Sequence, residues 1–584
     1  MIKSAIEHKS YSNFAFPVGK NSLKIRLKCA KNDLKEVKIV YGNRFVFDGS
    51  DPYKVKKMNI TASSKHCDFY EVVISLSDPR FRYHFMLNDG KEIYWYNEKG
   101  FSLNRPSGIK SGFFQYSLIT DDDLINRPEW FDSAVIYQIF PERFNNGDNS
   151  NDPDETSEWG EIPDSESFFG GDLQGIYEKL DYIEDLGVNT IYLTPIFQSP
   201  TNHKYNIDDY LKIDEHFGNK KIFKKLVDEA HKRGIKIILD AVFNHSGYDF
   251  FAFEDLREKG KESDYKDWYI YDELPLKTEI PVNYKTFASN IPTLPKLNTA
   301  NQEVQEYLLK VVRYWTEEFE IDGWRLDVAD EVDPAFWRKF RETVKSINPE
   351  SYIIGEVWHS GMKWLQGNQF DGTMNYSFAN AVIEFFGQNK IGPTEFHGRI
   401  TRNRMRYKTQ ISQSMLNLID SHDTPRLLHY CNERKEALKL AVLFQMTYQG
   451  IPMILYGDEL GITGGEEPDS RRCMPWNNAN QNFDLLNYYK KLINIRKNLT
   501  PLQQGSYQSL IVDEAKNIYG YSRIDATKRV DIIINNSPTT HKVTLKKELI
   551  KKEILTDKLT GQNYENNSNE FIIRLKPYQG RILV

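Results

Sequence analysis

Eight short apolar segments, mostly separated by amphipathic helices, constrain the fold of this chain more than any other feature. They are AVIYQIF (134–140), TIYLTPI (190–196), IKIILDAVF (235–243), IDGWRLDV (321–328), YIIGEVW (352–358), GTMNYSF (372–378), MLNLID (415–420) and MILYGDEL (453–460). Strands that alternate with helices favour a parallel sheet, and eight such units predict an α/β fold, the (β/α)8 TIM barrel. A doubly wound open sheet is the alternative, because a count of strands does not show closure.

The segments between the predicted strands have the apolar periodicity of helices, which supports the alternation of strands and helices. In GIYEKLDYIEDLG, the apolar Ile176, Leu180 and Ile183 recur at i, i+4 and i+7, and Gly187 is a stop signal. In KIFKKLVDEAHKRG, Ile222, Leu226 and Ala230 recur with the same period before Gly234. Both segments are predicted to be helices that cover the sheet.

Strand-like alternation before and after this region predicts three domains. The segment LKIRLK (23–28) places its three lysine and arginine side chains on one face, and NDG (88–90) predicts a hairpin turn. Alternation returns in VDIIIN (530–535) and EFIIRLK (570–576). We therefore expect antiparallel β-sandwiches at 1–122 and 504–584 around a barrel at 123–503. The interval 246–300 is too long for a simple loop and predicts an inserted subdomain.

Composition excludes several classes of function. The net charge of −6 over 584 residues gives no basic footprint for nucleic acid. No stretch approaches the roughly 18 apolar residues that a membrane helix needs, and MIKSAIEHKSYSNFAF lacks the pattern of a signal peptide. The four cysteines have no CxxC spacing. We expect a cytoplasmic protein with reduced thiols that binds neither nucleic acid nor membrane.

Charged residues stand where the barrel strands end. The third strand ends in Asp240, Asn244 and His245, the fourth in Arg325 and Asp327, the fifth in Glu356, and the seventh in His422 and Asp423. The carboxyl ends of the strands meet at one mouth of a TIM barrel, where active sites lie. Burying so many charges without a function would be costly, which favours an active site over a structural role.

These strand ends resemble a known family. DAVFNH, GWRLDVA, GEVWH and SHD resemble the four short regions of glycoside hydrolase family 13, the α-amylase family. LPKLN (294–298) and GDELGITGGEEPDSRRCMPW (457–476) are similar to the neopullulanase, cyclomaltodextrinase and maltogenic amylase branch. The resemblance implies a retaining hydrolase of α-1,4-glucosidic bonds in cyclomaltodextrins, pullulan, maltooligosaccharides and starch. It leaves open α-1,6 cleavage, transglycosylation and the preferred glucan.

The resemblance also implies roles for the three carboxylates. Asp327 corresponds to the nucleophile, Glu356 to the general acid/base, and Asp423 to the carboxylate that binds ring hydroxyls. Two carboxyl groups with different protonation states suit a retaining glycosidase. We expect Arg325 to lower the pKa of Asp327, and we expect Glu356 to lie in drier surroundings without a cationic partner.

The same comparison implies a set of substrate-binding residues. They are His203, Tyr205, His245, Arg325, His422, Glu467 and Arg471. The family usually has Asp where this chain has Asn206 and Glu467, and we expect both departures to lie near the pocket for the nonreducing-side sugar. Glu331, four residues after Asp327, is either an acceptor-sugar contact or an exposed carboxylate.

Two segments predict a structural calcium site. NNGDNSND (145–152) and FFGGD (168–172) supply closely spaced oxygen atoms, which calcium prefers as ligands. Spacing alone favours a solvated turn, whereas the resemblance implies calcium at Asn146, Asp148, Asn151, Asp152, Gly170 and Asp172.

The sequence leaves three alternative functions open, and the resemblance implies one partner. A plain α-amylase or α-glucosidase would share the same active site, and a catalytically inactive glucan-binding protein would lack at least one of the three carboxylates. The resemblance also implies a homodimer, in which the first domain narrows the cleft of the partner and favours small or cyclic substrates.

Overall fold

The computed structural model describes residues 1–45, 53–106, 112–288, 290–477, 479, 481–546, 552–566 and 569–584. They fall into two compact units. We call the first the N-terminal unit, which contains Met1–Asn126, Ile391–Ser412 and Tyr507–Ser522, and the second the barrel unit, which contains the rest.

The barrel unit is built on eight parallel strands. In chain order they are β11 (Ile136–Ile139), β12 (Thr190–Leu193), β15 (Lys236–Ala241), β16 (Gly323–Leu326), β17 (Tyr352–Gly355), β18 (Gly372–Thr373), β19 (Leu416–Asn417) and β20 (Ile451–Leu455). Their order in the sheet is β18-β17-β16-β15-β12-β11-β20-β19. A parallel bridge between Met374 and Leu416 joins the two end strands. The predicted TIM barrel is therefore confirmed over the alternative of an open sheet.

The sixth segment is less strand-like than its sequence predicts. The strand covers only Gly372–Thr373, and α7 (Tyr376–Val382) begins inside the predicted strand. The side chain of Asn375 accepts a hydrogen bond from the Phe378 N–H and caps this helix. A capping side chain outweighs the strand propensity of the following aromatic residue.

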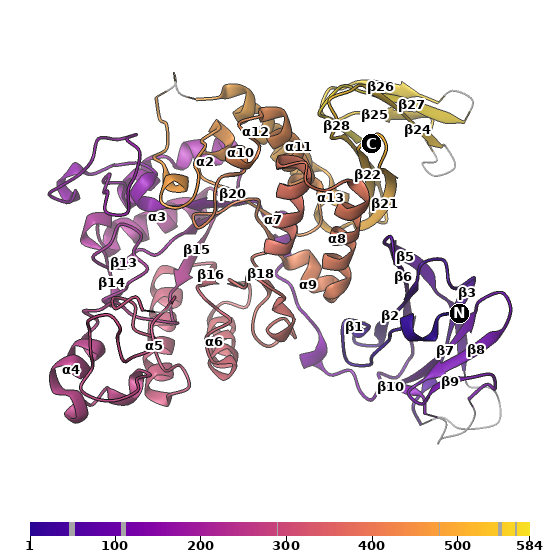
Figure 1. Cartoon of the computed structure of the whole chain (residues 1–584), viewed down its shortest axis with the longest axis horizontal. Coiled ribbons are helices and arrows are strands. Elements are labelled where there is room, and N and C mark those ends of the chain that lie inside the picture. The colour runs from indigo at the N-terminus through magenta and orange to yellow at the C-terminus, as the bar shows by residue number, and fades with distance from the viewer. Residues whose placement is uncertain are drawn as a thin grey trace. The chain divides into compact units, whose positions relative to one another are not determined.

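The first predicted helix is divided in two. It forms α1 (Leu173–Glu178) and α2 (Leu180–Leu186), and Gly187 ends the second helix with φ 92°. The next helix, α3 (Lys220–Lys232), buries Phe223, Leu226, Val227 and Ala230, whereas Ile222 is only partly buried. Together with α5 (Gln302–Phe319) and α6 (Pro334–Ile347), α3 lies around the strands of the barrel (Figure 1).

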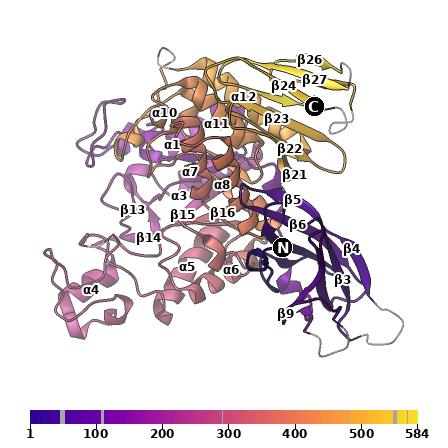
Figure 2. The same cartoon turned by 45° about the vertical axis from the view of Figure 1, so that its right-hand side comes forward.

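The interval after the third strand forms the predicted inserted subdomain. It contains α4 (Phe251–Lys259) and projects from the barrel in both views (Figures 1 and 2). Its return segment pairs with the barrel, because Lys296 forms a β-bridge with His245. This pairing brings the subdomain to the carboxyl ends of the strands.

The N-terminal unit contains two antiparallel sheets. One has the order β1 (Ala15–Gly19), β2 (Ser22–Ala30), β6 (Cys67–Ser75), β5 (Asn59–Ser63). The other has the order β4 (Lys54–Lys57), β3 (Glu36–Asn43), β7 (Phe81–Asn88), β8 (Ile93–Asn97), β9 (Gly100–Ser102), with β10 (Phe114–Tyr116) beside β7. Side chains of both sheets share one core, so the predicted sandwich is confirmed.

One of the three basic side chains on the same face of β2 is buried. Arg26 is 2% exposed, forms an ion pair with Glu71 and donates a hydrogen bond of 2.6 Å to the Tyr407 carbonyl. Tyr407 directly follows α8 (Pro393–Arg406), which belongs to the same unit. Alternation along β2 predicts the face of the sheet on which Arg26 lies, but it does not predict that α8 covers this face.

The last part of the chain is antiparallel, as predicted. Strand β23 (Arg529–Asn535) pairs with β28 (Gln579–Leu583), β24 (His541–Lys546) with β27 (Glu570–Leu575), and β25 (Ile554–Thr556) with β26 (Asn563–Glu565).

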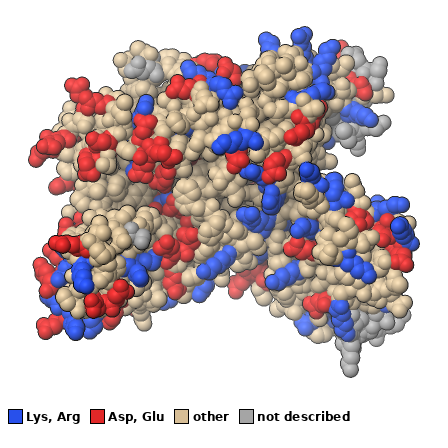
Figure 3. Space-filling view, viewed as in Figure 1, with Lys and Arg blue, Asp and Glu red and all other residues tan. Residues whose placement is uncertain are grey.

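On the surface of the molecule, basic and acidic side chains are interspersed over the face that Figure 3 shows. Among the described residues, no helix is both long and apolar enough to cross a membrane.

Candidate active site

A pocket of about 610 Å³ opens where the barrel strands end. Its lining includes eight residues that the sequence predicts for the site: His203, Tyr205, His245, Asp327, Glu356, Asp423, Glu467 and Arg471. The other two predicted residues, Arg325 and His422, are almost fully buried and contact the lining residues. The inserted subdomain contributes Phe287, Ile291 and Leu294 to the wall.

Arg325 holds three carboxylates. Its Nη1 atom donates to Asp327 Oδ1 at 2.7 Å and to both carboxylate oxygens of Asp240 at 3.0 Å. Its Nη2 atom lies 2.9 Å from Glu356 Oε2 in an ion pair. Parallel register explains the arrangement, because Asp240 on β15 lies beside Arg325 on β16. The expectation that Glu356 lacks a cationic partner is therefore wrong.

Burial controls the protonation of these carboxyl groups. It raises the pKa of Asp327 well above its usual value, and the negative charges of Glu356 and Asp240 add to this effect, while Arg325 opposes it. The predicted lowering of the Asp327 pKa is therefore wrong in its net direction. Burial also raises the pKa of Glu356, against the opposing effect of Arg325. One guanidinium cannot compensate three buried negative charges, so protonation is favoured within the cluster.

Asp327 and Glu356 differ in how their carboxylate oxygens are engaged. Asp327 Oδ2 is buried and has no hydrogen-bond partner among the described residues. Glu356 accepts the Val328 N–H at 2.9 Å on Oε2 and the Trp358 indole N–H at 3.2 Å on Oε1. Asp327 can thus present a free oxygen to a sugar, while Glu356 is held from two sides.

Val328 adopts a strained backbone conformation to make its contact with Glu356. Its φ of 44° lies in the left-handed region, which a β-branched residue rarely occupies. Such conformations cost about 1–3 kcal/mol and cluster at functional sites. Nothing in the sequence signals this strain, because valine is an ordinary strand residue.

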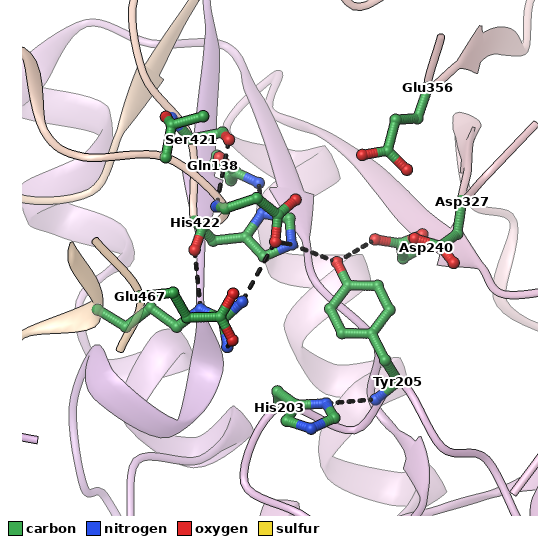
Figure 4. A network of polar contacts seen from close by, with 12 residues as sticks. Gln138, His203, Tyr205, Asp240, Asp327, Glu356, Ser421, His422 and Glu467 are labelled. Carbon is green, nitrogen blue, oxygen red and sulfur yellow. Dashed lines mark hydrogen bonds and ion pairs between the residues drawn. The ribbon is translucent and has the colours of Figure 1, made fainter. Parts of the chain in front are cut away.

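A hydrogen-bonded chain joins Asp240, Tyr205, His422 and Gln138 (Figure 4). Tyr205 donates its hydroxyl to Asp240 Oδ2 at 2.9 Å and lies 2.6 Å from His422 Nε2. Gln138 Nε2 lies 2.7 Å from His422 Nδ1. With the Gln138 amide in this orientation, His422 carries its proton on Nε2. Asp240 and Gln138 were not among the predicted site residues. The sequence does indicate Asp240, because it is a charged residue at the end of a predicted strand.

Asp423 adjoins this chain, because its Oδ1 lies 3.1 Å from His422 Nε2, and it is held by Arg471. Arg471 Nη2 lies 3.2 Å from Asp423 Oδ1, and Nη1 lies 2.7 Å from Glu467 Oε1. The guanidinium also donates to the His422 carbonyl at 2.8 Å, which ties the segment after β20 to the end of β19. One arginine thus positions two carboxylates that line the pocket.

The three predicted histidines are favoured in the neutral form. Burial lowers the pKa of His203 and that of His245 to about 3 each. It also lowers the pKa of His422 well below its usual value, and Arg471 adds to the effect. Neutral imidazoles can donate and accept hydrogen bonds with sugar hydroxyls without adding charge.

The two departures from the family pattern lie in different places. Glu467 lines the pocket, as expected. Asn206 does not line it: its side-chain oxygen accepts hydrogen bonds from the hydroxyls of Ser199, at 2.8 Å, and Thr201. Asn206 therefore shapes the loop after β12. Asn206 directly follows Tyr205, which does line the pocket.

Residues beyond Asp327 add contacts on the other side of the pocket. Glu331 lines the pocket and pairs with Lys296 of the LPKLN segment at 2.9 Å. Trp358 also lines it, is 52% exposed and stacks on Tyr376 with a centroid distance of 3.8 Å. Trp358 was not among the predicted residues, although it stands two positions after Glu356.

The loop after β11 gathers the residues predicted for calcium. Asn146 and Asn151 each have a buried side-chain oxygen without a hydrogen-bond partner among the described residues. Burial raises the pKa of Asp152 and of Asp172. Asp172 accepts the backbone N–H groups of Gly147 and Asp148, and Asp148 accepts that of Ser150.

Gly170 closes this loop at a point where no side chain fits. Its φ is 77°, and a Cβ atom there would lie 2.3 Å from Asp152 Oδ1. Among the described residues, no three Asp, Glu, His or Cys side chains group closely enough to hold a metal. A cation here would therefore depend on amide and carbonyl oxygens as well, a donor set that fits calcium.

Comparison with known proteins agrees with this geometry. The catalytic-domain model of alpha amylase matches residues 138–483, and its N-terminal ig-like domain model matches residues 1–120. The chain is 46% identical over 555 residues to a cyclomaltodextrinase from Thermoanaerobacter pseudethanolicus, covering 95% of this chain and 96% of the relative. It is 44% identical over 587 residues to neopullulanase 2 from Thermoactinomyces vulgaris, covering 100% and 99%.

A solved structure of a cyclomaltodextrinase matches the whole chain. The TM-score is 0.95 at 38% sequence identity, with 100% of both chains covered. This chain is a glycoside hydrolase and belongs to the α-amylase family.

Proposed function

We propose that this chain hydrolyses α-1,4-glucosidic bonds with retention of anomeric configuration, as an enzyme of the cyclomaltodextrinase and neopullulanase kind. The observation that carries the proposal is the Arg325 cluster. It places Asp327, whose Oδ2 has no hydrogen-bond partner among the described residues, and Glu356 on one guanidinium at the pocket, where burial raises the pKa of both groups and favours protonation within the pair. A retaining glycosidase needs such a pair, one ionised and one protonated.

The first step forms a covalent intermediate. Asp327 Oδ2 attacks the anomeric carbon of the bound glucose, and the bond from that carbon to the glycosidic oxygen breaks. Glu356 gives its proton to the departing oxygen, so the leaving sugar ends with a hydroxyl group. Arg325 stays paired with Asp327 Oδ1, which holds the carboxylate in place without engaging the attacking oxygen.

The second step returns the enzyme to its starting state. Glu356, now ionised, takes a proton from a water molecule, and the resulting oxygen attacks the anomeric carbon from the face that the first sugar left. The bond to Asp327 breaks, and its carboxylate is restored. If a sugar hydroxyl replaces the water, the same step gives transglycosylation.

The remaining pocket residues bind the sugar that carries the reacting carbon. Asp423, Arg471 and the neutral His203 and His245 offer hydrogen bonds to ring hydroxyls. Tyr205 presents its ring to the pocket, and its hydroxyl is held by Asp240. Contacts that strengthen as the sugar flattens toward an oxocarbenium ion lower the barrier.

Product analysis tests the function. We expect hydrolysis of cyclomaltodextrins to be faster than that of pullulan and starch, with α-configured products in proton NMR. A β-configured first product would contradict retention. Starch cleaved faster than cyclomaltodextrin would favour the plain α-amylase alternative, and release of glucose alone would favour the α-glucosidase. Absence of any turnover would favour a glucan-binding protein.

We infer that calcium binds in the loop after β11. The supporting features are the unpaired oxygens of Asn146 and Asn151, the partly buried Asp152 and the buried Asp172, with Gly170 in the cradle. Asp148, the sixth residue that the resemblance implies, is used as a helix cap. Bound calcium would supply positive charge to these oxygens and stabilise the loop, away from the reacting carboxylates.

Chelation should therefore lower the melting temperature. At calcium about 100-fold above its Kd, the ion should add about 2.7 kcal/mol to the free energy of unfolding. EDTA should remove this increment, and added calcium should restore it. The measurement is thermal unfolding with and without chelator.

Two substitutions locate the ion in this loop. Asn146→Ala removes an unpaired oxygen and should abolish the response to EDTA, whereas the exposed Asn149→Ala should keep it. An unchanged melting temperature of the parent protein in excess EDTA would contradict the calcium site.

We also propose that the chain forms a homodimer through its N-terminal unit. The aromatic residues Phe81, Tyr83 and Phe85 are unavailable for such a contact because they lie in the sandwich core, whereas Tyr94 and Trp95 on β8 are partly exposed. Sedimentation should give twice the chain mass of 68.4 kDa. Dilution into monomers should raise starch hydrolysis relative to cyclomaltodextrin hydrolysis. A monomer at high concentration would contradict the dimer.

Dilution is a better test than deletion of residues 1–120. Deletion would remove Arg26 and Ser63, which bond to Tyr407 and Thr401 within the same unit. It would therefore leave α8 without the sheet that covers it.

A cytoplasmic location is the last element of the proposal. All four cysteines, Cys29, Cys67, Cys431 and Cys473, are free thiols. Free thiols are typical of reducing compartments.

A further inference from the structure

A second pocket lies in the barrel unit, lined by residues that do not line the catalytic pocket. Its volume is about 430 Å³, within the range of roughly 300–1,000 Å³ that is typical of small-molecule sites. Trp159 contributes from the loop after β11, and the segment after β20 contributes Thr463, Arg472, Trp476 and Asn477.

Trp159 provides a rigid apolar surface in this pocket. Its indole N–H donates to the Met474 carbonyl at 2.9 Å, which fixes the ring. It is only partly buried, and among the described residues no aromatic ring packs against it. A fixed indole with a free face is suited to the apolar face of a sugar ring.

Trp476 is held more tightly and forms the side of the pocket. It packs edge-on against Phe144 and Tyr182, at centroid distances of 5.2 Å each. The Lys179 ammonium lies 4.3 Å from its ring centroid. Trp476 therefore shapes the wall, while Trp159 offers the open platform.

Polar groups surround the platform without adding net charge. Arg472 is paired with Asp469 through Nη2 at 2.6 Å, which neutralises its charge. The Thr463 hydroxyl is buried and has no partner among the described residues. Asn477 is exposed, and its amide oxygen accepts the Ala479 N–H at 3.0 Å. A neutralised guanidinium does not favour an anion, whereas a hydroxyl and an amide suit a ligand rich in hydroxyl groups.

We propose that this pocket is a second α-glucan-binding site, with Trp159 as the stacking platform and Thr463, Arg472 and Asn477 as hydroxyl partners. The choice of an α-glucan as ligand rests on the proposed function of the catalytic pocket. The segment 460–477 serves both pockets, because Glu467 and Arg471 face the catalytic one. The Tyr456 hydroxyl holds the Arg472 carbonyl at 2.8 Å. A glucan in the second site thus contacts the segment that positions Asp423.

Binding stoichiometry tests the proposal. Calorimetric titration of maltotriose into the full-length Asp327→Asn protein should give two binding events per chain. Trp159→Ala in that background should weaken one event at least tenfold, and Trp159→Phe should retain it because a ring remains. Trp358→Ala, at the catalytic pocket, should weaken only the other event.

The outcomes separate this site from the proposed function. One event per chain, or two events unaffected by Trp159→Ala, would overturn the second site. If Trp159→Ala does not fold, Arg472→Gln must weaken the same event, or the site is rejected. Hydrolysis is measured separately with the parent protein. Its absence would overturn the proposed function whatever the stoichiometry, and intact hydrolysis with one event would overturn the second site alone.

Discussion

Asp327→Asn should reduce kcat on maltooligosaccharides by on the order of 10⁴-fold or more, as expected when an enzyme loses its nucleophile. The substitution keeps the shape of the side chain, and the remaining amide oxygen can still accept the Arg325 N–H that now reaches Oδ1 at 2.7 Å. It removes the oxygen that lacks a partner and the charge that attack requires. Activity is measured as reducing-sugar release with protein verified as folded.

The same substitution should not lower stability. Asp327 is one of three carboxylates around a single buried guanidinium, so removing one negative charge relieves repulsion. We expect an unchanged or higher melting temperature. A tenfold or smaller loss of kcat would reject Asp327 as the nucleophile.

Asp322→Asn is the matched control on the same part of the chain. Asp322 lies just before β16, at the end of the strand opposite the pocket, and pairs with Lys236 at 2.9 Å and His231 at 2.8 Å. Residues at this end of a barrel strand contribute to stability. Asp322→Asn should therefore lower the melting temperature and leave kcat close to that of the parent.

Glu356→Gln should give a large loss on natural glucans that depends on the leaving group. The amide cannot protonate a glycosidic oxygen, and general acid catalysis contributes typically 10²–10⁴-fold. With an α-glycosyl fluoride the leaving group needs little protonation, so formation of the intermediate should return toward the parent rate. The measurement is the ratio of fluoride to maltooligosaccharide cleavage for each protein.

Asp327→Asn supplies the control for this rescue. Fluoride still needs a nucleophile, so that variant should stay inactive on both substrates. If Glu356→Gln cleaves the fluoride no better, relative to the parent, than it cleaves a glucan, Glu356 is not the acid.

The pH dependence of these proteins follows from the direction of the pKa shift. Burial raises the pKa of Glu356, so the parent should keep its acid protonated above the usual range of a glutamate and lose activity as pH rises through the raised value. The acid limb should also lie above the usual range of an aspartate, because burial raises the pKa of Asp327 as well, and both limbs belong to the coupled pair. Glu356→Gln with fluoride should lack the alkaline limb and retain the acid one.

Local patterns in the sequence predicted the eight strands of the barrel, and the resemblance of the strand ends to the α-amylase family implied roles for the three carboxylates. The spacing of apolar residues reflects the backbone geometry of each helix or strand. Residues two apart on a strand point to the same face, so the sequence of this strand alone places Arg325 and Asp327 side by side. The order of Asp327, Glu356 and Asp423 at successive strand ends is likewise a property of the sequence. These features are short-range, so a single sequence contains them.

The tertiary structure alone decided how the reacting groups are held and protonated. Glu356 meets Arg325 because β17 lies beside β16 in register, and Asp240 joins them from β15. Burial then raises the pKa of Asp327 against the pull of Arg325, which adjacency along the strand cannot reveal. The side-chain oxygen of Asn206 binds hydroxyls of its own loop, and Asn206 does not line the pocket. Burial and through-space neighbours depend on the whole packed chain, so periodicity and motif spacing do not contain them.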